Sequence, residues 1–278
     1  MLHIFDTIKT VLKKAMADDI LGTTARVAYY FFLAIFPAII ALFALAGIVG
    51  GDQAFQWIMS RVRQGLPQDA ESIVEQFVGG ITGESRPGLL SVGIVGVLWA
   101  ASSSFNGLTI GLNKMYDVEE GRSWWKRRLV AAGLFIAAGV VLNLGAAAIL
   151  AGPELIRALG LDAVVVYATW AAAFVVITAL FWLTYYLLPH ADQSSGKKEV
   201  LIGAVVGTVV WALASALFRA YVANFGSYAA TYGVLAGVIV LMLWLYITAL
   251  AILFGGEVAA TLQQEAQSTP GNRLSRNV

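Results

Sequence analysis

The sequence contains no cysteine and only two histidines, His3 and His190. Without cysteine the chain cannot form a disulfide scaffold, a thiolate zinc site, a cysteine nucleophile or a thiolate-bound iron–sulfur cluster, and its redox compartment stays undetermined. Two isolated histidines cannot build a multi-histidine metal site within one chain. The motifs G-x-x-x-x-G-K-[ST] and H-E-x-x-H are absent, and no G-x-G-x-x-G opens a strand–helix unit. We therefore expect no metal, no other cofactor and no active site of the common soluble enzyme classes.

Charged residues are scarce as well, at 13% of 278 residues, against about 25% in an average soluble domain. The 18 basic and 17 acidic side chains give a net charge of +1, so the chain is neither a globally basic nucleic-acid binder nor a globally acidic protein. Hydrophobic residues make up 59% of the chain, and the mean hydropathy is +0.77. This composition indicates that the lipid bilayer is the main partner and solvent of the chain, and that nucleic acid is not a partner.

Six charge-free stretches are long enough to cross a bilayer, because about 20 residues in a helix span its hydrocarbon core. A transmembrane barrel would need many alternating segments of about ten residues, so continuously apolar runs favour helices that satisfy their own backbone. The runs lie at about residues 27–50, 89–112, 129–151, 163–188, 200–218 and 232–256. The expected fold class is all-α, a polytopic membrane bundle of six transmembrane helices over residues 27–262.

Residues 1–26 form an amphipathic segment before the first run. Apolar residues recur here at helical spacing, with Lys9, Lys13 and Lys14 away from that stripe, as in a helix lying on a membrane surface. A helix packed on the underside of the bundle has the same pattern, and both interpretations stay open. The first run starts later than a cleavable signal peptide would, so we expect it in the mature protein. Residues 263–278 are polar and are expected to form a disordered cytoplasmic tail.

The basic residues predict the orientation, because Lys and Arg are retained on the cytoplasmic side of a membrane. Cytoplasmic amino and carboxyl termini place most of the 18 basic residues inside and agree with an even number of spans. The five that would lie outside are Arg61, Arg63, Arg86, Arg157 and Arg219. The string WWKRR at residues 124–128 is then typical of an aromatic and basic anchor at the inner leaflet.

The longest outer segment, residues 51–87, carries two apolar stripes at helical spacing, one over residues 55–62 and one over residues 70–77. Pro67 suits the first turn of the second helix, and a pair of glycines follows its expected end. We therefore expect short amphipathic helices in the outer loop between the first and second spans.

Polar residues inside apolar runs are costly unless they face a partner or a water-filled cavity. Asn106 and Asn113 lie seven residues apart, on about the same face of the second span, and Asn143 lies on the third span. Such residues form hydrogen bonds between helices, or they line a cavity that binds polar parts of a substrate. Both interpretations stay open for all three.

Charged and aromatic groups at the ends of spans provide further candidates. Arg26 begins the first span and Glu257 ends the sixth, both at the inner level, where a structural ion pair is the simplest expectation for Glu257. Arg219 ends the fifth span at the outer level, where it snorkels or caps a loop, or captures an anionic group. The candidates for a substrate pathway are Arg26, Asn106, Asn113, Asn143, Arg219, Tyr232 and Glu257.

Three G-x-x-x-G motifs, at residues 107–111, 203–207 and 233–237, predict close helix packing.

Three longer strings carry a family resemblance. They are ARVAYYFFLAIFPAIIALFALAG from residue 25, GVLWAASSSFNGLTIGLNKMYDVEEGRSWWKRR from residue 96, and FRAYVANFGSYAATYGVLAGVIVLMLWLYITALAILFGGEVAATL from residue 218. They resemble the BrkB/YihY family of bacterial inner-membrane proteins, over about residues 20–262. The third string, with its pattern YG-x-L-x-G-V-I-V-L-x-L-W-L-Y, is the most specific.

The resemblance implies a six-helix, multi-pass protein of the bacterial cell inner (cytoplasmic) membrane. Family members have been called virulence or serum-resistance factors, have carried the label ribonuclease BN, and include proteins suggested to help lipids or lipid precursors across the membrane. The resemblance supplies no established catalytic residues. Metal-assisted hydrolysis of RNA requires clustered histidine and carboxylate ligands in a water-filled site, and the apolar segments contain none, so we expect no ribonuclease activity.

We expect a non-enzymatic transporter or flippase-like protein for a lipid-like or small amphipathic or anionic substrate. The sequence has no nucleotide site, so transport would be facilitated, ion-coupled or driven by a partner. The alternative is a scaffold or envelope-integrity protein that binds envelope partners or a second copy of itself through the outer cap and the inner basic loops. A lipid-modifying enzyme would need paired carboxylates or a nucleophile–base pair, and the sequence suggests neither.

Overall fold

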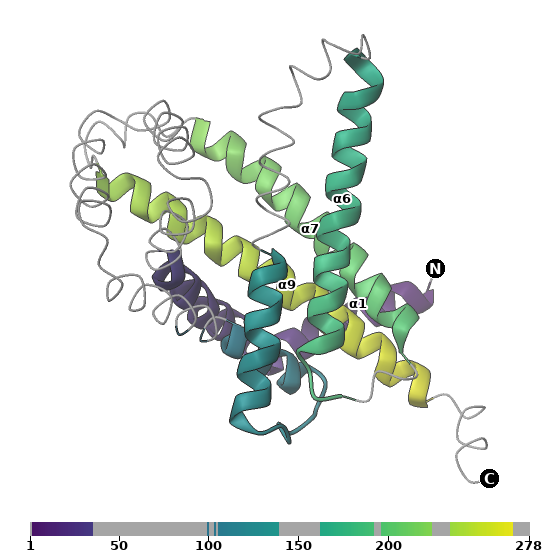
Figure 1. The fold of residues 1–278 in the computed structure, drawn as a ribbon. Coiled ribbons are helices and arrows are strands. Elements are labelled where there is room, and N and C mark those ends of the chain that lie inside the picture. Colours follow the sequence, from purple (N-terminus) through teal and green to yellow (C-terminus); the bar gives the residue numbers. More distant parts are fainter. Residues whose placement is uncertain are drawn as a thin grey trace.

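The computed structural model describes residues 2–35, 99, 103, 105–138, 162–191, 196–223 and 234–268. Every regular element within these ranges is a helix, and no strand occurs in them (Figure 1). The predicted all-helical fold class is therefore confirmed. The expected helices of the outer loop at residues 51–87 lie outside the described residues.

Three long helices dominate the described part of the chain: α6 (Asp162–Leu187), α7 (Lys197–Ala223) and α9 (Val234–Ser268). Each is long and apolar enough to cross a membrane, and together they correspond to the fourth, fifth and sixth expected spans. A shorter apolar helix, Ile20–Ile35, begins the first expected span. The count of six spans and the cytoplasmic position of both termini stay predictions.

The last helix is longer than a membrane requires. α9 has 35 residues, which is about 52 Å at 1.5 Å per residue, whereas the hydrocarbon core is about 30 Å thick. The prediction of a disordered tail from residue 263 is wrong for residues 263–268, which are helical. The reason is that Gln264 and Glu265 form hydrogen bonds with other segments of the protein instead of remaining in water.

α7 and α9 cross at glycines, as the motif at residues 203–207 predicts. A Cβ atom added at Gly203 would lie 2.6 Å from both the Ala259 Cβ atom and the Gly255 carbonyl oxygen, a separation at which something must move. Tyr185 of α6 completes the junction, because its hydroxyl donates a 2.7 Å hydrogen bond to the Ile252 carbonyl. The close approach predicted for this motif is therefore confirmed.

A helix at residues 105–115 packs on the first expected span and on α9. A Cβ atom added at Gly111 would lie 2.8 Å from the Thr23 Cγ2 atom and 3.0 Å from the Leu253 Cδ2 atom, which confirms close packing at the motif 107–111. At Gly237 an added Cβ atom would meet nothing within 4 Å among the described residues, so this end of the third motif makes no close contact there.

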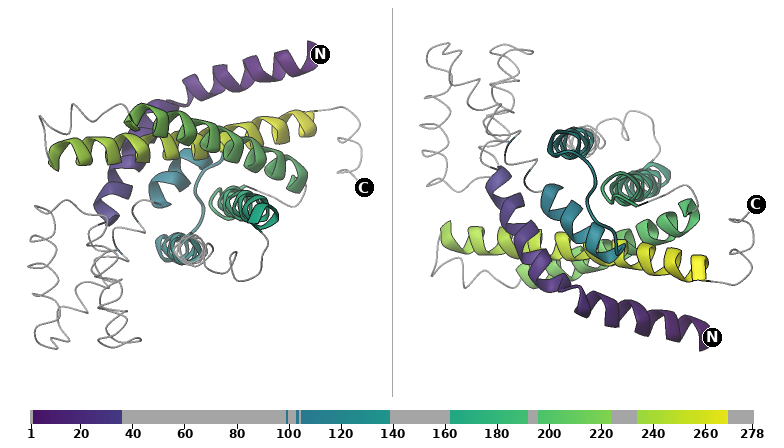
Figure 2. Two further views of the ribbon diagram at one scale, coloured as in Figure 1. Left: turned by 90° about the horizontal axis from the view of Figure 1, so that it is seen from above. Right: turned by 90° about the horizontal axis from the view of Figure 1, so that it is seen from below.

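Helix α1 (Leu2–Ala17) lies beside the last part of α9 and runs antiparallel to it (Figure 2). Val11 and Ala15 are buried, and the Thr7 hydroxyl donates a 3.3 Å hydrogen bond to the Glu265 carboxylate. Packing on the bundle, one of the two interpretations of this segment, is thus confirmed. The opposite face exposes a second apolar row, for which contact with the membrane surface stays a prediction; it consists of Ile8, Leu12 and Met16.

Four connecting segments meet at one end of the described structure. Lys14 at the end of α1 contacts the turn after residues 105–115 and the end of α9, and the loop at residues 116–123 is bonded to the end of α6. Gly196, just before α7, lies against the side chain of Gln263. These are the four segments that the basic residues predict to be cytoplasmic. The buried core lies at the same end; among its largest fully buried side chains are Leu108, Leu112, Met115, Tyr185, Leu188, Val200 and Leu253.

Candidate functional site

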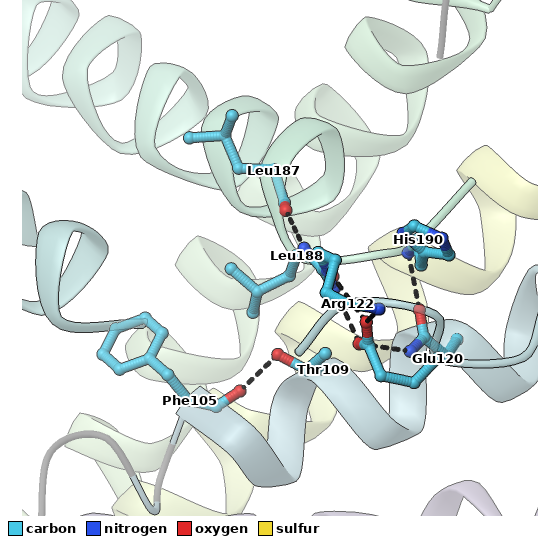
Figure 3. A network of polar contacts seen from close by, with 8 residues as sticks. Phe105, Thr109, Glu120, Arg122, Leu187, Leu188 and His190 are labelled. Atoms are coloured by element: carbon cyan, nitrogen blue, oxygen red, sulfur yellow. Dashed lines mark hydrogen bonds and ion pairs between the residues drawn. The ribbon is translucent and has the colours of Figure 1, made fainter. Parts of the chain in front are cut away.

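A polar network joins the loop at residues 116–123 to the end of α6, as Figure 3 shows for Glu120, Arg122 and Leu187. Asn113 links the two sides of this network. Its side-chain nitrogen donates a 3.0 Å hydrogen bond to the Glu120 carboxylate, and its side-chain oxygen accepts one of 2.7 Å from the backbone N–H of His190. Both ends of the amide are therefore bonded within the protein. This bonding is that of a residue that fastens loops, and a role for Asn113 in a substrate pathway stays a prediction.

Glu120 and Arg122 form the charged part of this network. The Arg122 backbone N–H and Nε donate to one carboxylate oxygen of Glu120 at 3.0 and 2.8 Å, and Nη2 donates to the other at 2.8 Å. The guanidinium also donates to the carbonyls of Leu187, at 2.9 Å, and Leu188. The last carbonyl groups of a helix lack hydrogen-bond donors within the helix, and Arg122 supplies donors to those at the end of α6.

The electrostatic consequence is a strongly acidic Glu120. The side-chain hydrogen bonds from Arg122 lower the pKa of Glu120 from its usual 4.5 to about 2, with smaller help from the Arg122 backbone N–H and Asn113 and against the opposing effect of burial. Hydrogen bonds to the ionised form are the cause, because they stabilise the carboxylate over the acid. Glu120 is therefore ionised near neutral pH, and both of its carboxylate oxygens accept hydrogen bonds.

A second polar cluster lies between α1 and α9. The Lys14 ammonium donates to the Gln264 side-chain oxygen and, at 3.4 Å, to Asp117. The Gln264 amide nitrogen in turn donates a 2.9 Å hydrogen bond to Asp117. Asp117 lies in the turn after residues 105–115 at a φ of 53°, so the cluster joins three segments that are distant in the sequence.

Glu257 is fully buried beside this cluster and faces Asp18, in the turn between α1 and Ile20–Ile35. Among the described residues Glu257 forms no ion pair: the Thr261 hydroxyl donates to one carboxylate oxygen at 3.2 Å, and the other oxygen has no donor there. The reason is that the nearby cation, Lys14, bonds Asp117 and Gln264 instead. Burial raises the pKa of Asp18, against the opposing charges of Lys114 and Lys14.

The remaining candidates are dispersed. Arg26 is exposed on Ile20–Ile35, and Arg219 is exposed near the far end of α7. Arg219 follows Gly203 by sixteen residues, about 24 Å along the helix, so it lies far from Asn113 and Glu257. Asn143 and Tyr232 lie outside the described residues.

Asn106 differs from Asn113 although the sequence treats them alike. Its side chain is half-buried, and its amide oxygen is buried with no hydrogen-bond partner among the described residues. One turn further along the helix the Thr109 hydroxyl is satisfied, because it donates a 2.9 Å hydrogen bond to the Phe105 carbonyl. Within the part of the chain that the structure describes, Asn106 thus leaves one acceptor without a donor.

Sequence reasoning missed most of these partners. The run DVEEGR at residues 117–122 signals a charged loop, but nothing in it says which charge pairs with which. The pairing of Asp18 with Glu257 joins opposite ends of the sequence and leaves no local signal. Within the described ranges no group of three or more histidine or acidic side chains is arranged to hold a metal ion.

Comparison with known proteins decides the family. A family model described as "Virulence factor BrkB" matches residues 11–277. The chain belongs to the BrkB family. BrkB membership and the three long apolar helices together make it a membrane protein.

Relatives of this BrkB protein agree with that assignment. It is 34% identical over 252 residues to the ribonuclease-like protein YfkH of Bacillus subtilis, covering 87% of this chain and 89% of that protein. It is 27% identical to a UPF0761 membrane protein of Halorhodospira halophila over 96% of this chain and 59% of that protein. A UPF0761 membrane protein of Actinobacillus pleuropneumoniae is 23% identical over 92% of both chains. No solved structure matches the chain.

Proposed function

We propose that this BrkB protein is a multi-pass protein of the bacterial inner membrane that moves or flips a lipid-like, or a small amphipathic or anionic, substrate. The observation that supports this function is the Asn106 amide oxygen, which is buried with no hydrogen-bond partner among the described residues. A buried amide oxygen without a partner costs about 1–3 kcal/mol. A polar group of a passing substrate would satisfy it.

The position of Asn106 fits a route through the bundle. Asn113 follows it by seven residues, about 10 Å along the same helix, and belongs to the polar network at the end of the bundle. A substrate group that leaves Asn106 would therefore meet polar groups within two turns. The sequence contains no nucleotide-binding motif, so the movement is facilitated, ion-coupled or driven by a partner.

Reconstituted vesicles test this function. We expect the purified protein to speed the exchange of a fluorescent phospholipid between leaflets of phosphatidylethanolamine–phosphatidylglycerol vesicles, read by dithionite quenching, or the efflux of an entrapped fluorescent anion. Asn106→Leu and Arg219→Ala should slow the movement several-fold. Thr109→Val is the matched control, because its hydroxyl is already bonded to its own helix. Movement no faster than in empty vesicles, for lipid and anion alike, contradicts the proposal.

A scaffold function is the second candidate, and exposed aromatic residues favour it. Trp124 is 44% exposed and Trp125 is 70% exposed, at the end where the connecting segments meet. Arg128 lies 4.4 Å from the ring centre of Trp99 and 4.5 Å from that of Trp124. A scaffold predicts that Trp124→Ala abolishes an envelope phenotype in a deletion strain whereas Asn106→Leu restores growth. Transport predicts the opposite pattern.

We also infer that the chain is not a nuclease, although one relative is named ribonuclease-like. Its sequence offers two histidines and no cysteine, and metal-assisted hydrolysis of RNA needs several such ligands around an open, water-filled site.

A further inference from the structure

We infer that Asp18 and Glu257 form a proton-binding site, in which one shared proton fastens the turn between α1 and Ile20–Ile35 to α9. The ligand is a proton, and the site is separate from the proposed transport function, because binding and fastening are both measurable without a substrate.

The two carboxyl groups lie together without a donor from the described residues. Glu257 has no exposed surface, and its side chain lies within hydrogen-bonding reach of the Asp18 carboxyl group. Two carboxylates have only acceptors, so a hydrogen bond between them forms only when one of them carries a proton. The Asp18 Oδ2 and Glu257 Oε2 atoms are both buried, and neither has a donor among the described residues. A shared proton supplies the missing donor.

Electrostatics favours one proton over none. Two carboxylates that share a buried site cannot both ionise cheaply, because each destabilises the charge of the other. Burial also raises the pKa of Asp18. A proton on the pair removes one of the two charges and makes the other a good acceptor.

The charges around the pair do not replace the proton. Lys14 of α1 attracts both carboxyl groups, but its ammonium is bonded to Asp117 and Gln264. Lys114, on the helix at residues 105–115, attracts Asp18 and is exposed to solvent. Asp117 repels both members of the pair, and on α9 itself only the Thr261 hydroxyl donates to Glu257.

The position of Asp18 gives the proton a structural effect. Asp18 follows α1 directly, and Asp19 turns the chain with a φ of 53° into the next helix. A bond from Asp18 to α9 therefore holds the junction of both helices. When both carboxyl groups are ionised they repel each other, and the segment that carries α1 loses this attachment.

A carbodiimide reports the proton directly. A carboxylic acid transfers its proton to one nitrogen of dicyclohexylcarbodiimide, and the resulting carboxylate oxygen bonds to the central carbon of the reagent. The adduct then rearranges to a stable acylurea, and no group leaves. We expect mass spectrometry of the labelled full chain to find the adduct on Asp18 or Glu257, decreasing about tenfold for each pH unit once the proton dissociates. Glu120 is the control: it is more exposed than Glu257, at 17% of its side chain, but Arg122 holds it ionised, so it should stay unlabelled.

Cross-linking reports the attachment. The chain lacks cysteine, so Thr7→Cys and Glu265→Cys, whose native side chains are hydrogen-bonded, give a single pair for a short thiol cross-linker. The same pair with Glu257→Gln corrects for the pH dependence of the thiols, because an amide donates to Asp18 without titrating. We expect the rate of the parent pair relative to the Gln variant to fall several-fold between about pH 6 and about pH 9. Asp18→Asn should abolish the pH dependence in the same way.

The outcomes separate the alternatives. A relative rate that is constant with pH, together with no label on either residue, overturns the proposal. A rate that sodium or potassium ions restore at high pH also overturns it, because the ligand is then a monovalent cation. If Glu257→Gln does not purify as a monodisperse protein, the carbodiimide result and the Asp18→Asn variant decide.

Discussion

Glu120 and Glu257 show how the surroundings of a carboxyl group set its chemistry. Both lie near the end of the bundle where the connecting segments meet. Glu120 receives four hydrogen bonds from Arg122 and Asn113, whereas Glu257 is buried against another acid. One group is therefore held ionised, and the other takes part in a shared-proton contact. The contacts of Glu120 therefore persist near neutral pH, whereas the contact between Glu257 and Asp18 depends on pH.

The network of Glu120 gives a prediction about stability. Its pKa is about 2 in the folded protein against a usual 4.5, so the carboxylate stabilises the fold above about pH 4.5 and loses this contribution as the pH falls toward 2. We expect Glu120→Gln to lower the free energy of unfolding by about 1–2 kcal/mol at neutral pH. Tryptophan fluorescence during thermal unfolding in detergent measures the change.

The control for this prediction is the exposed neighbour Glu119, for which Glu119→Gln should change the unfolding temperature little. The gap between the parent protein and Glu120→Gln should narrow as the pH falls below about 4.5. A gap of constant size down to pH 2.5 would contradict the assignment of the stabilisation to the ionised carboxylate.

Only part of the site could be predicted from the sequence. The cost of polar groups in lipid singled out Asn106 and Asn113 together, because residue type and helical face are visible in a sequence. The difference between them depends on partners that come from other segments, such as the backbone N–H of His190. The burial of Glu257 against Asp18 is equally invisible, because a run of residues does not say which distant turn will cover it.

Among the elements, the crossing of α7 and α9 depends on having no side chain at Gly203. We expect Gly203→Ala to destabilise the protein by about 1–3 kcal/mol, because its Cβ atom would lie 2.6 Å from Ala259 and from a backbone oxygen. Gly237→Ala is the matched control, since its Cβ atom would meet none of the described residues within 4 Å, and it should be neutral or stabilise α9 slightly. Thermal unfolding of both variants in the same detergent measures the contrast, and equal effects would refute the crossing.

The elements themselves were predicted well in kind and less well in extent. The apolar runs at about residues 200–218 and 232–256 stop at the first charge, whereas α7 extends from Lys197 to Ala223 and α9 ends at Ser268. A charge ends a hydrophobic run but not a helix, because its backbone hydrogen bonds do not depend on side-chain polarity. The helix therefore continues wherever the polar side chains find partners, as Gln264 does.

For the whole molecule, the meeting of four connecting segments at one end predicts that they share one side of the membrane. A single cysteine in place of Lys126 or Lys197 should react with a membrane-impermeant maleimide only after the membrane is permeabilised. A single cysteine in place of Arg61 should react in intact cells. The cysteine-free parent provides a clean background. Reaction of Arg61→Cys and Lys126→Cys from the same side would refute the six-span topology.

Because α9 is a long helix, a tilt of α9 moves its two ends in opposite directions. The crossing at Gly255 divides the helix into unequal arms, about 30 Å toward Leu235 and about 20 Å toward Ser268. A tilt of about 10° about this fulcrum moves the two tips in opposite directions by about 5 Å and 3 Å. α1 is hydrogen-bonded to the shorter arm. A displacement of the long arm would therefore be transmitted to α1 through these hydrogen bonds alone.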